Sequence, residues 1–411
     1  MRVTLTQLQG ALSPYLYGIA IASVRSNCRA IMALEVSTLT TVDQLRSIRR
    51  EWLDLLRRAR LDLPFIWPEW VVTWWELFRQ ERLDIRDRLR VKAVRRDSGE
   101  LVAIVPMMVT ERPAVGPTRV RTIGFLGADN YVTEQRAPIV DPAWENEVAQ
   151  ALAADLQSDR SWDWVAWEGL QPESLLARRL GQLMELCWSS SQPQNMLRLA
   201  PSWEQFRLGL KHHIKDSLRH CYNSLRRAGL TASIDVAAKP DEIRPALEIF
   251  FRLHSAICQH RKDTTRPNRF ADPIVRRFLI ETYSQFADHD LARLFTLRIE
   301  GVPVACRLGF MLPECLYLYY SGYDPVWRKY GVGTTITAEA IKYAITSGLP
   351  RVQLSMGADA SKSRWGPETR LFCGAVCVRR GLYSRTTFYL YSRVRASTGP
   401  LKGMKRLPGR R

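Results

Sequence analysis

Hydrophobic and polar positions alternate between two periods along the chain. From residue 41 to about residue 200, stretches with apolar residues three or four positions apart are followed by short stretches of strand character. Helices are predicted over 42–60, from Pro68 onward with Trp70, Trp74, Trp75 and Phe78, over 145–156 and over 173–186; strands are predicted over 91–96, 101–109, 120–126 and 162–167. The turn Asp97-Ser98-Gly99-Glu100 favours a hairpin between the first two strands. The tryptophans can line a ligand groove or, at helical spacing, belong to the core.

The same order of elements returns after residue 202 with a longer helical opening. Helices are predicted over 203–227, 242–260 and 272–286, and strands over 294–299 and 304–310, which pair across Glu300-Gly301. An aromatic strand over 315–323, a glycine-rich turn, a helix and a strand over 351–355 follow. The repetition predicts an α/β chain with layered helices and sheets. We expect an N-terminal extension (1–40), two similar domains (41–200 and 201–385) and a basic flexible tail (386–411).

The turn after the aromatic strand has residue types that suit a pyrophosphate. It reads Arg328-Lys329-Tyr330-Gly331-Val332-Gly333, and Thr334 and Thr335 are expected to cap the next helix. N–H groups at a helix start are unpaired, glycine admits close approach, and an arginine adds a cation. A tight strand-to-helix connection without a ligand is the alternative. The predicted cofactor-binding residues are Arg328, Tyr330, Gly331, Val332, Gly333 and Thr334.

The corresponding place in the first half reads Gly127-Ala-Asp-Asn-Tyr-Val-Thr-Glu134. It lacks the arginine and the paired glycines. A single cofactor site, in the second half, is therefore expected.

Charge favours anionic partners without choosing among them. The chain has 60 Lys and Arg against 41 Asp and Glu, a net charge of +19, which suits a nucleotide cofactor, nucleic acid, a membrane surface or an acidic polymer. The stretch 393–411 has many Lys and Arg and no acid, and can either anchor the chain to an anionic surface or simply aid solubility. It contains no aromatic residue for stacking on bases, which disfavours nucleic acid.

Cysteine, histidine and apolar patterns point to a cytoplasmic protein without a metal. The 8 cysteines have no zinc-ribbon spacing and the 6 histidines form no metal pattern. No segment reaches the roughly 20 apolar residues that a membrane span needs. For residues 1–40, translation from Met32 or an unstructured extension is preferred over a signal peptide.

The stretch from Leu39 to Tyr383 resembles the two-domain GNAT-like acyltransferases called the CelD or BioF-like acetyltransferase family, which are related to the FemABX peptidyltransferases. The Arg328, Gly331 and Gly333 positions fit the GNAT signature of Gln or Arg, two spacers, Gly, spacer, and Gly or Ala. The other motifs are Pro68-Glu-Trp70 with Trp74 and Trp75, Leu253-His254, Val302-Pro-Val-Ala305, Tyr323-Asp-Pro325 and Lys362-Ser-Arg-Trp365-Gly366.

The resemblance implies tandem GNAT-like domains, each a mixed, mostly antiparallel sheet flanked by helices. It also implies acyl transfer from a thioester, usually acetyl-CoA, to an amine or hydroxyl, in some members linked to polysaccharide or cell-envelope synthesis. In such a fold the strands 315–323 and 351–355 splay apart and hold pantetheine, with the thioester between Tyr320 and Ser355.

Direct attack on a thioester needs a group that deprotonates the acceptor, and Asp359 and His254 are the candidates. Asp359 follows the second splayed strand, although an aspartate there can equally cap the loop. His254 has a suitable intrinsic pKa but lies in an apolar helical pattern, where a core histidine is also expected. Tyr320, or its neighbours Tyr319 and Tyr323, can protonate the leaving thiolate.

The residues predicted to bind the acceptor substrate are mainly cations. Lys211, Lys215 and Arg219 form a helical stripe beside a buried arc of Leu210, Ile214, Leu218, Cys221 and Leu225. The stripe can overhang a cleft between domains or be a solvated face. Lys362 and Trp365 complete the predicted substrate-binding set. The alternatives are aminoacyl transfer from aminoacyl-tRNA, as in FemABX enzymes, and a non-catalytic basic binding protein with a vestigial site.

Overall fold

The computed structural model describes residues 34–114, 116–127, 132–260 and 268–398. In the first half, the elements in chain order are β1 (Leu34–Leu39), α2 (Val42–Ser47), α3 (Arg49–Ala59), α4 (Pro68–Phe78), β2 (Arg86–Leu89), β3 (Val91–Arg96), β4 (Leu101–Val105), β5 (Met107–Pro113), β6 (Arg119–Phe125), β7 (Ile139–Val140), α5 (Glu145–Ser158), β8 (Trp164–Leu170), α6 (Leu175–Met184) and β9 (Cys187–Arg198).

The second half continues with its own helices and strands. They are α7 (Trp203–Gly209), α8 (His212–Arg227), β10 (Ala232–Ala237), α9 (Pro240–His260), α10 (Pro273–Ala287), β11 (Ala292–Ile299), β12 (Val302–Leu312), β13 (Cys315–Tyr323), the 3-10 helix η4 (Pro325–Tyr330), α11 (Val332–Thr346), β14 (Arg351–Met356), α12 (Ala360–Ser363), β15 (Glu368–Val378) and α13 (Leu382–Thr398). In the described part of the chain, no helix is both long and apolar enough to cross a membrane.

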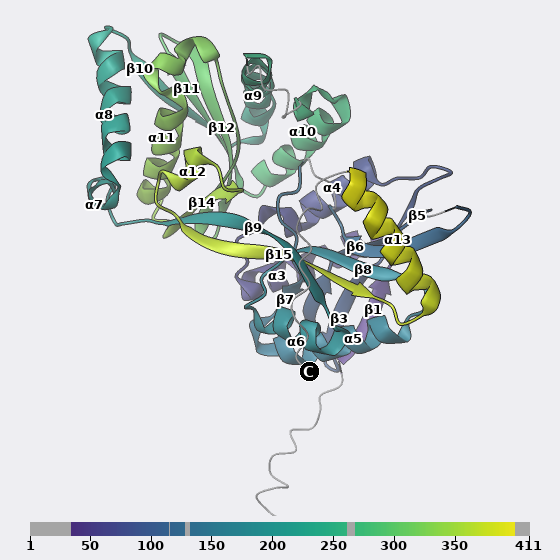
Figure 1. Cartoon of the computed structure of the whole chain (residues 1–411). Helices are drawn as coiled ribbons and strands as arrows, with labels where there is room; N and C mark the ends of the chain where they lie inside the picture. The colour runs from purple at the N-terminus through teal and green to yellow at the C-terminus, as the bar shows by residue number, and fades with distance from the viewer. Residues whose placement is uncertain (1–33, 115, 128–131, 261–267, 399–411) are drawn as a thin grey trace, which may run out of the picture.

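The strands form two sheets, one of which runs through both halves (Figure 1). The smaller sheet has the order β1-β3-β4-β7, and the larger has the order β10-β11-β12-β13-β14-β9-β15-β8-β6-β5-β2. Among the described strands, only β13 with β14 and β6 with β8 pair in parallel. The predicted mixed, mostly antiparallel α/β fold is confirmed.

Strand exchange at β9 and β15 joins the halves. β9 leaves the first half to pair with β14, and β15 returns from the second half to pair with β8. The two strands also pair with each other over most of their length. The sequence pattern missed β9, because its serine- and glutamine-rich residues show no alternation of apolar and polar positions.

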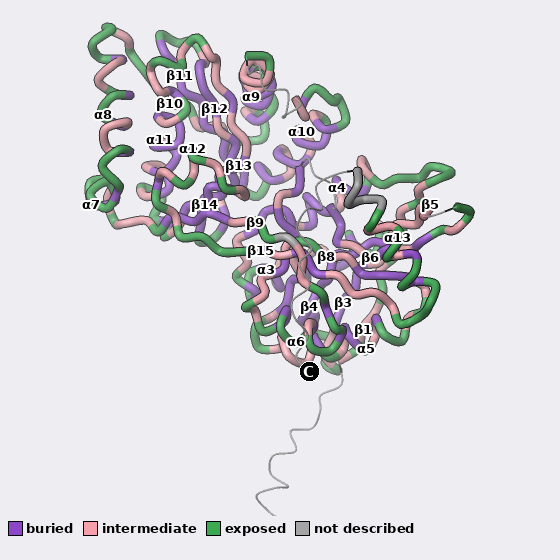
Figure 2. The backbone as a smooth tube through the Cα atoms, viewed as in Figure 1, coloured by how far each residue is buried: buried purple, intermediate pink, exposed green. Residues whose placement is uncertain are grey.

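A hydrophobic core is also shared. One cluster contains Trp52 and Trp70 of the first half together with Phe278, Phe310 and Tyr317 of the second. Trp74 and Trp75 are buried there too, which makes these tryptophans core residues and not the lining of a groove. In Figure 2, β11 and β12 are largely buried, while α8 alternates between buried and exposed residues. The halves therefore stabilise each other by burial of a common apolar surface.

Two predicted elements are divided in the structure. The helix over 42–60 is interrupted at Ile48, and Thr41 caps the shorter α2 in a capping box with Gln44. The strand over 101–109 is interrupted at Pro106, which has no N–H for a strand ladder. β4 accordingly belongs to the smaller sheet and β5 to the larger one.

The expectations for both chain ends need correction. Residues 34–39, assigned to an extension, form β1 paired with β3. Residues up to Thr398, assigned to a flexible tail, form α13, whose Phe388 and Tyr391 rings lie 5.4 Å from the buried Trp164 ring. The many basic residues of this stretch led to the prediction of a flexible tail, although its aromatic residues form a face that packs on the first half. Residues 1–33 and 399–411 lie outside the described residues.

Candidate active site

Strands β13 and β14 separate after a short parallel ladder. They pair at Cys315 with Arg351, Leu316 with Val352 and Tyr317 with Gln353, and at no later position. The opening matches the splay expected between these strands. Beyond Tyr317 and Gln353 the two strands no longer pair with each other.

Each of the diverging strands carries an extra residue where the gap opens. On β13, the step from Leu318 to Ser321 is opposite the shorter step from Gly309 to Arg307 on β12. On β14, the pairing with β9 shifts in the same way between Gln353 and Met356. β-Bulges bend a strand and increase its twist. The two bulges therefore turn β13 and β14 away from each other.

The strain of the β14 bulge falls on Ser355. This residue is buried and has a φ of 63°, in the left-handed region that side chains other than glycine rarely adopt. Gly357 follows with a φ of 104°. Backbone strain of this kind is often found at functional sites.

The glycine turn ends in an open helix N-terminus. Gly331 is the N-cap of α11 with a φ of 67°, so the expectation that Thr334 and Thr335 cap the helix is wrong; Thr335 bonds back to the Gly331 carbonyl from inside the first turn. Among the described residues, the N–H groups of Val332 and Gly333 have no acceptor. Gly333 is exposed, and a Cβ there would meet only the Tyr323 ring, at 3.8 Å. These features suit close approach of an anion.

Helix α8 packs behind the turn. A Cβ on Gly331 would lie 2.3 Å from Cys221 Sγ, and His220 Nε2 is 3.1 Å from the carbonyl oxygen of Lys329. The predicted buried arc of α8 is present, since Ile214, Leu218, Cys221 and Leu225 are buried. The helix supports the conformation of the turn from its inner side.

The basic stripe of α8 does not face the first half. The helix lies at the end of the second half that is farthest from the first (Figure 1). Lys215 donates to the Leu208 carbonyl, Arg219 pairs with Asp216 at 3.1 Å, and Lys211 is an exposed N-cap. Of the two interpretations of Lys211, Lys215 and Arg219, the structure therefore favours a solvated helix face over a stripe that overhangs a cleft between domains, because α8 uses its apolar arc to pack on α11.

The cations near the turn differ in their availability. The Arg328 side chain is exposed, and Tyr330 is half-buried with Lys329 Nζ 5.0 Å from its ring centroid. Arg364, which the sequence did not single out, donates to Thr334 Oγ1 at 3.4 Å. Arg364 therefore brings a positive charge to the first turn of α11.

Asp359 is engaged in capping α12. Its carboxylate accepts from the Ser361 N–H at 3.0 Å and pairs with Lys362 Nζ at 3.2 Å. Burial works in the opposite direction, but the Ser361 hydrogen bond and the Lys362 charge hold the pKa of Asp359 below its ordinary value. A carboxylate with a lowered pKa is a weak proton acceptor.

Two further predicted site residues follow on the same segment. Lys362 also donates to the Met356 carbonyl at the end of β14, so it lies beside the gap. Trp365 is only 4% exposed and packs in the core that includes α11. The structure therefore gives Trp365 a packing role and no surface for a substrate.

His254 and Tyr320 lie together at the β13 bulge. His254 Nδ1 is 3.1 Å from the Ser321 carbonyl oxygen, so Nδ1 carries the proton and Nε2 is left as an acceptor. Burial lowers the pKa of His254, although the Ser321 bond opposes this. The ring centroids of His254 and Tyr320 are 5.9 Å apart, and Tyr320 Oη accepts from Arg269 at 3.3 Å.

Glu134 is the site residue that the sequence prediction missed. It follows residues 128–131, which lie outside the described residues, and its Oε2 accepts from the Tyr317 hydroxyl at 2.6 Å and from the Met356 N–H at 3.4 Å. Burial raises its pKa, which the Tyr317 bond and the Lys362 charge offset only in part. The available signal was an acidic residue, Glu134, in the segment after β6 at the chain position that matches the glycine turn of the second half.

A second buried charge lies close by. Arg307 on β12 is half-buried, and its Nε is buried and has no hydrogen-bond partner among the described residues. Burial lowers its pKa to about 10, while the charges of Glu134 and Asp359 act in the other direction. An acidic and a basic group, each partly removed from bulk water, therefore lie at the gap, an arrangement typical of active sites.

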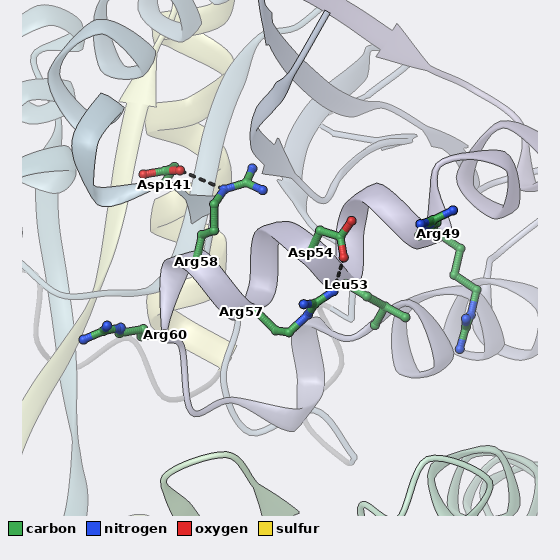
Figure 3. A pocket seen from close by; sticks show the side chains of 8 residues that line it. Arg49, Leu53, Asp54, Arg57, Arg58, Arg60 and Asp141 are labelled. Carbon is green, nitrogen blue, oxygen red and sulfur yellow. Dashed lines mark hydrogen bonds and ion pairs between the residues drawn. The ribbon is translucent and has the colours of Figure 1, made fainter.

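An open hollow elsewhere on the first half is lined by arginines of α3 and by Asp141 (Figure 3). Arg58 pairs with Asp141 at 2.9 Å, and Arg57 pairs with Asp54. The hollow shares no residue with the gap between β13 and β14. It adds to the basic surface of the first half.

Splayed parallel strands beside a glycine-bounded helix N-terminus define the GNAT class of acyltransferase folds. Residues 213–363 match the family described as Acetyltransferase (GNAT) domain. This stretch of the second half is therefore similar to a GNAT domain, in agreement with the resemblance to GNAT-like acyltransferases that the sequence motifs indicate.

The chain is similar to several solved structures at low sequence identity, and the likeness to FemX shows a shared fold. FemX is 12% identical, with 82% of this chain and 96% of FemX covered and a TM-score of 0.54. L-PGS from Bacillus licheniformis is 13% identical, with 84% and 96% covered and a TM-score of 0.46. A tandem GNAT protein from the clavulanic acid biosynthesis pathway is 13% identical, with 85% and 99% covered and a TM-score of 0.44. No curated protein matches the sequence of the chain.

Proposed function

We propose that this chain is an acyl-CoA-dependent acyltransferase that moves an acetyl group from acetyl-CoA to an amine or hydroxyl acceptor by direct attack. The observation that carries the proposal is the placement of a helix N-terminus, exposed at Gly333 and with no acceptor for the N–H groups of Val332 and Gly333 among the described residues, beside the point where β13 and β14 stop pairing with each other. A pyrophosphate and an extended pantetheine arm need these two features side by side.

The residues present fit such a co-substrate. The pyrophosphate would be held by the N–H groups of Val332 and Gly333, with Thr334 in the same turn and Arg328 and Tyr330 on the preceding η4. Gly331 sets the turn, since only glycine adopts its φ without strain and leaves room for Cys221. Arg364 is added to this set. The bound co-substrate would supply the activated acyl group.

The division of labour between the halves is also a proposal. Residues 41–200 would be a degenerate GNAT-like domain and residues 201–385 the domain that binds acyl-CoA. The shared sheet and core mean that this boundary separates functions and not independently packed units.

The identity of the acceptor is supported by fewer observations than the identity of the co-substrate. A role in polysaccharide or cell-envelope synthesis is suggested by the family resemblance, and a screen of amino sugars and hydroxyl-bearing saccharides tests it. FemABX-like aminoacyl transfer is the alternative, because the fold shared with FemX spans both halves. That reaction would use aminoacyl-tRNA and would not need the open N-terminus of α11.

Binding of acetyl-CoA is the deciding experiment. Acetyl-CoA should raise the melting temperature of the wild-type chain, and Gly333→Glu should abolish the shift, because its carboxylate would repel the phosphates. Gly209→Glu, at another glycine with open space, is the matched control and should keep the shift. A wild-type chain that acetyl-CoA does not stabilise contradicts the proposal and favours aminoacyl transfer or a vestigial site.

A further inference from the structure

A carboxylate of the first half lies where two strands of the second half separate. Tyr317, which donates to Glu134 at 2.6 Å, is the last residue of β13 that pairs with β14. Met356, whose N–H donates to the same oxygen at 3.4 Å, ends β14. Glu134 thus bridges the two strands at the point where the gap opens.

One oxygen of this carboxylate is held and the other is available. Both donors, Tyr317 and Met356, bind Oε2, and no described residue donates to Oε1. The residue is half-buried, so it is neither sealed in the core nor free in solvent. Oε1 can therefore accept a proton while Oε2 keeps the side chain in place.

The segment that carries Glu134 is fixed on each side. The Tyr319 hydroxyl donates to the Val132 carbonyl, Trp70 Nε1 donates to Thr133 Oγ1 at 3.1 Å, and Gln194 donates to Gln135 Oε1 at 2.8 Å. These contacts come from both halves of the chain. The carboxylate is therefore positioned before any ligand arrives, as catalytic groups need to be.

The charges around Glu134 suit a proton acceptor. Tyr317 and Tyr283 face it as neutral hydroxyls, while Lys362 of α12 and Arg307 of β12 bring positive charge. Burial raises the pKa of Glu134, whereas the pKa of Asp359 is lowered. Of the two carboxylates near the gap, Glu134 is the stronger base.

We infer that Glu134 is the catalytic base of the acyl transfer, supplied by the first half to the site of the second; the inference rests on the proposed acyltransferase function. The acceptor nitrogen or oxygen forms a bond to the thioester carbonyl carbon, and its proton passes to Oε1. The carbon–sulfur bond breaks, and sulfur leaves with the electron pair. The proton then passes from Glu134 to the thiolate, which restores the carboxylate.

This role gives the first half a function despite its missing cofactor turn. The chain position that matches the glycine turn of the second half carries Glu134 in its place. Neither half alone contains both the acyl-CoA turn and the base. We therefore expect catalysis to require the intact chain.

The test measures thiol release from acetyl-CoA with primary amines, amino sugars, hydroxyl-bearing saccharides, hydroxylamine and water as acceptors. Glu134→Gln keeps the size and hydrogen bonds of the side chain but cannot accept the proton, so turnover should fall by about 100-fold or more. The thermal shift with acetyl-CoA should be unchanged. Glu76 of α4 forms an exposed ion pair with Arg46 of α2, so Glu76→Gln is the control and should retain full turnover.

Two readouts separate a base from a merely structural residue. Glu134→Ala should regain activity when formate is added, because formate can enter the vacated space and take the proton. The rise of kcat/KM with pH that reports the ionisation of the base should disappear in Glu134→Gln. A structural residue would show neither effect.

The outcomes distinguish this inference from the function on which it rests. If Glu134→Gln keeps turnover within about threefold of wild type, Glu134 is not the base, and loss in Asp359→Asn or His254→Gln would identify the group that is. If the wild-type chain binds acetyl-CoA and transfers the acyl group, the proposed function stands in either case. If it neither binds nor releases thiol with any acceptor, both proposals fail together.

Discussion

The hydroxyl of Tyr317 donates a 2.6 Å hydrogen bond to Oε2 of Glu134, which is 183 positions away in the sequence. The bond connects the first half of the chain to a strand that borders the gap between β13 and β14. The bond also lowers the pKa of Glu134, which burial raises. The stability and the chemistry of the site are therefore linked through this pair.

Replacing Glu134 should not destabilise the protein at neutral pH. A carboxyl whose pKa is raised on folding binds its proton more tightly in the native state, so its contribution to stability declines as pH rises above the ordinary value of 4.5. Glu134→Gln removes that cost. The free energy of unfolding of the variant, relative to wild type, should increase from pH 4.5 to pH 7 in urea titrations. A loss of more than about 1 kcal/mol at pH 7 would indicate a structural role.

Tyr317→Phe should shift the pH dependence of catalysis. The hydroxyl stabilises the charged form of Glu134, so its removal raises the pKa of that carboxyl further and moves the rising limb of the kcat/KM profile to higher pH. Stability should fall by about 1–2 kcal/mol, as expected when a charged group loses a hydrogen bond. Tyr283→Phe is the control, because its buried hydroxyl has no hydrogen-bond partner. An unmoved profile in Tyr317→Phe would contradict the pairing.

His254 should make the protein less stable in mild acid. Burial lowers its pKa from the ordinary 6.5, so the unfolded chain binds the proton first and stability falls as pH drops below about 6.5. His254→Gln can still donate to the Ser321 carbonyl but does not titrate. The difference in unfolding free energy between pH 7 and pH 5 should be smaller in the variant. An equal difference in both proteins would show that His254 is not the group responsible.

Gly331→Ala should destabilise the chain by about 1–3 kcal/mol. The new Cβ would lie 2.3 Å from Cys221 Sγ, and the φ of 67° is unfavourable for alanine. Chemical denaturation measures the change. Gly333→Ala, where the nearest atom to a Cβ is 3.8 Å away, should change stability by less than about 1 kcal/mol. Equal effects of the two substitutions would argue against the packing of α8 on the turn.

Phe388→Ala tests the docking of α13. The Phe388 ring packs on Trp164, and its removal should cost about 1–3 kcal/mol in guanidinium titrations. Tyr389→Ala, one position along the helix and exposed, should cost less than about 0.5 kcal/mol. If both variants are as stable as wild type, α13 does not contribute to folding.

Local patterns were sufficient for the unit from Cys315 to Met356. The aromatic strand, the glycine turn, the helix and the following strand are each specified by residues within a few positions, and all four are found. The cap was misassigned by a few residues because Gly331, in the left-handed conformation, starts α11 before the threonines are reached. Hairpins at Gly99 and Glu300-Gly301 were found for the same local reason.

The pattern of apolar and polar residues did not predict contacts between segments that are distant in the sequence. β9 pairs with strands on both sides, so it needs little intrinsic preference for strand conformation. In α13, the aromatic residues that contact the first half stand among basic residues in the sequence, so their packing was not predicted. The stripe of Lys211, Lys215 and Arg219 was correct as a helical face, but its orientation depended on how α8 packs against α11.

Chain-local chemistry thus specified the glycine turn, since helix starts and glycine conformations depend on neighbouring residues. The choice of the carboxylate at the gap between β13 and β14 was made by the shared core and the exchange of β9 and β15, which bring Glu134 to Tyr317 and Met356. Burial and opposing charges then set the pKa of Glu134. Both depend on atoms far apart in sequence, so they exist only once the chain has folded.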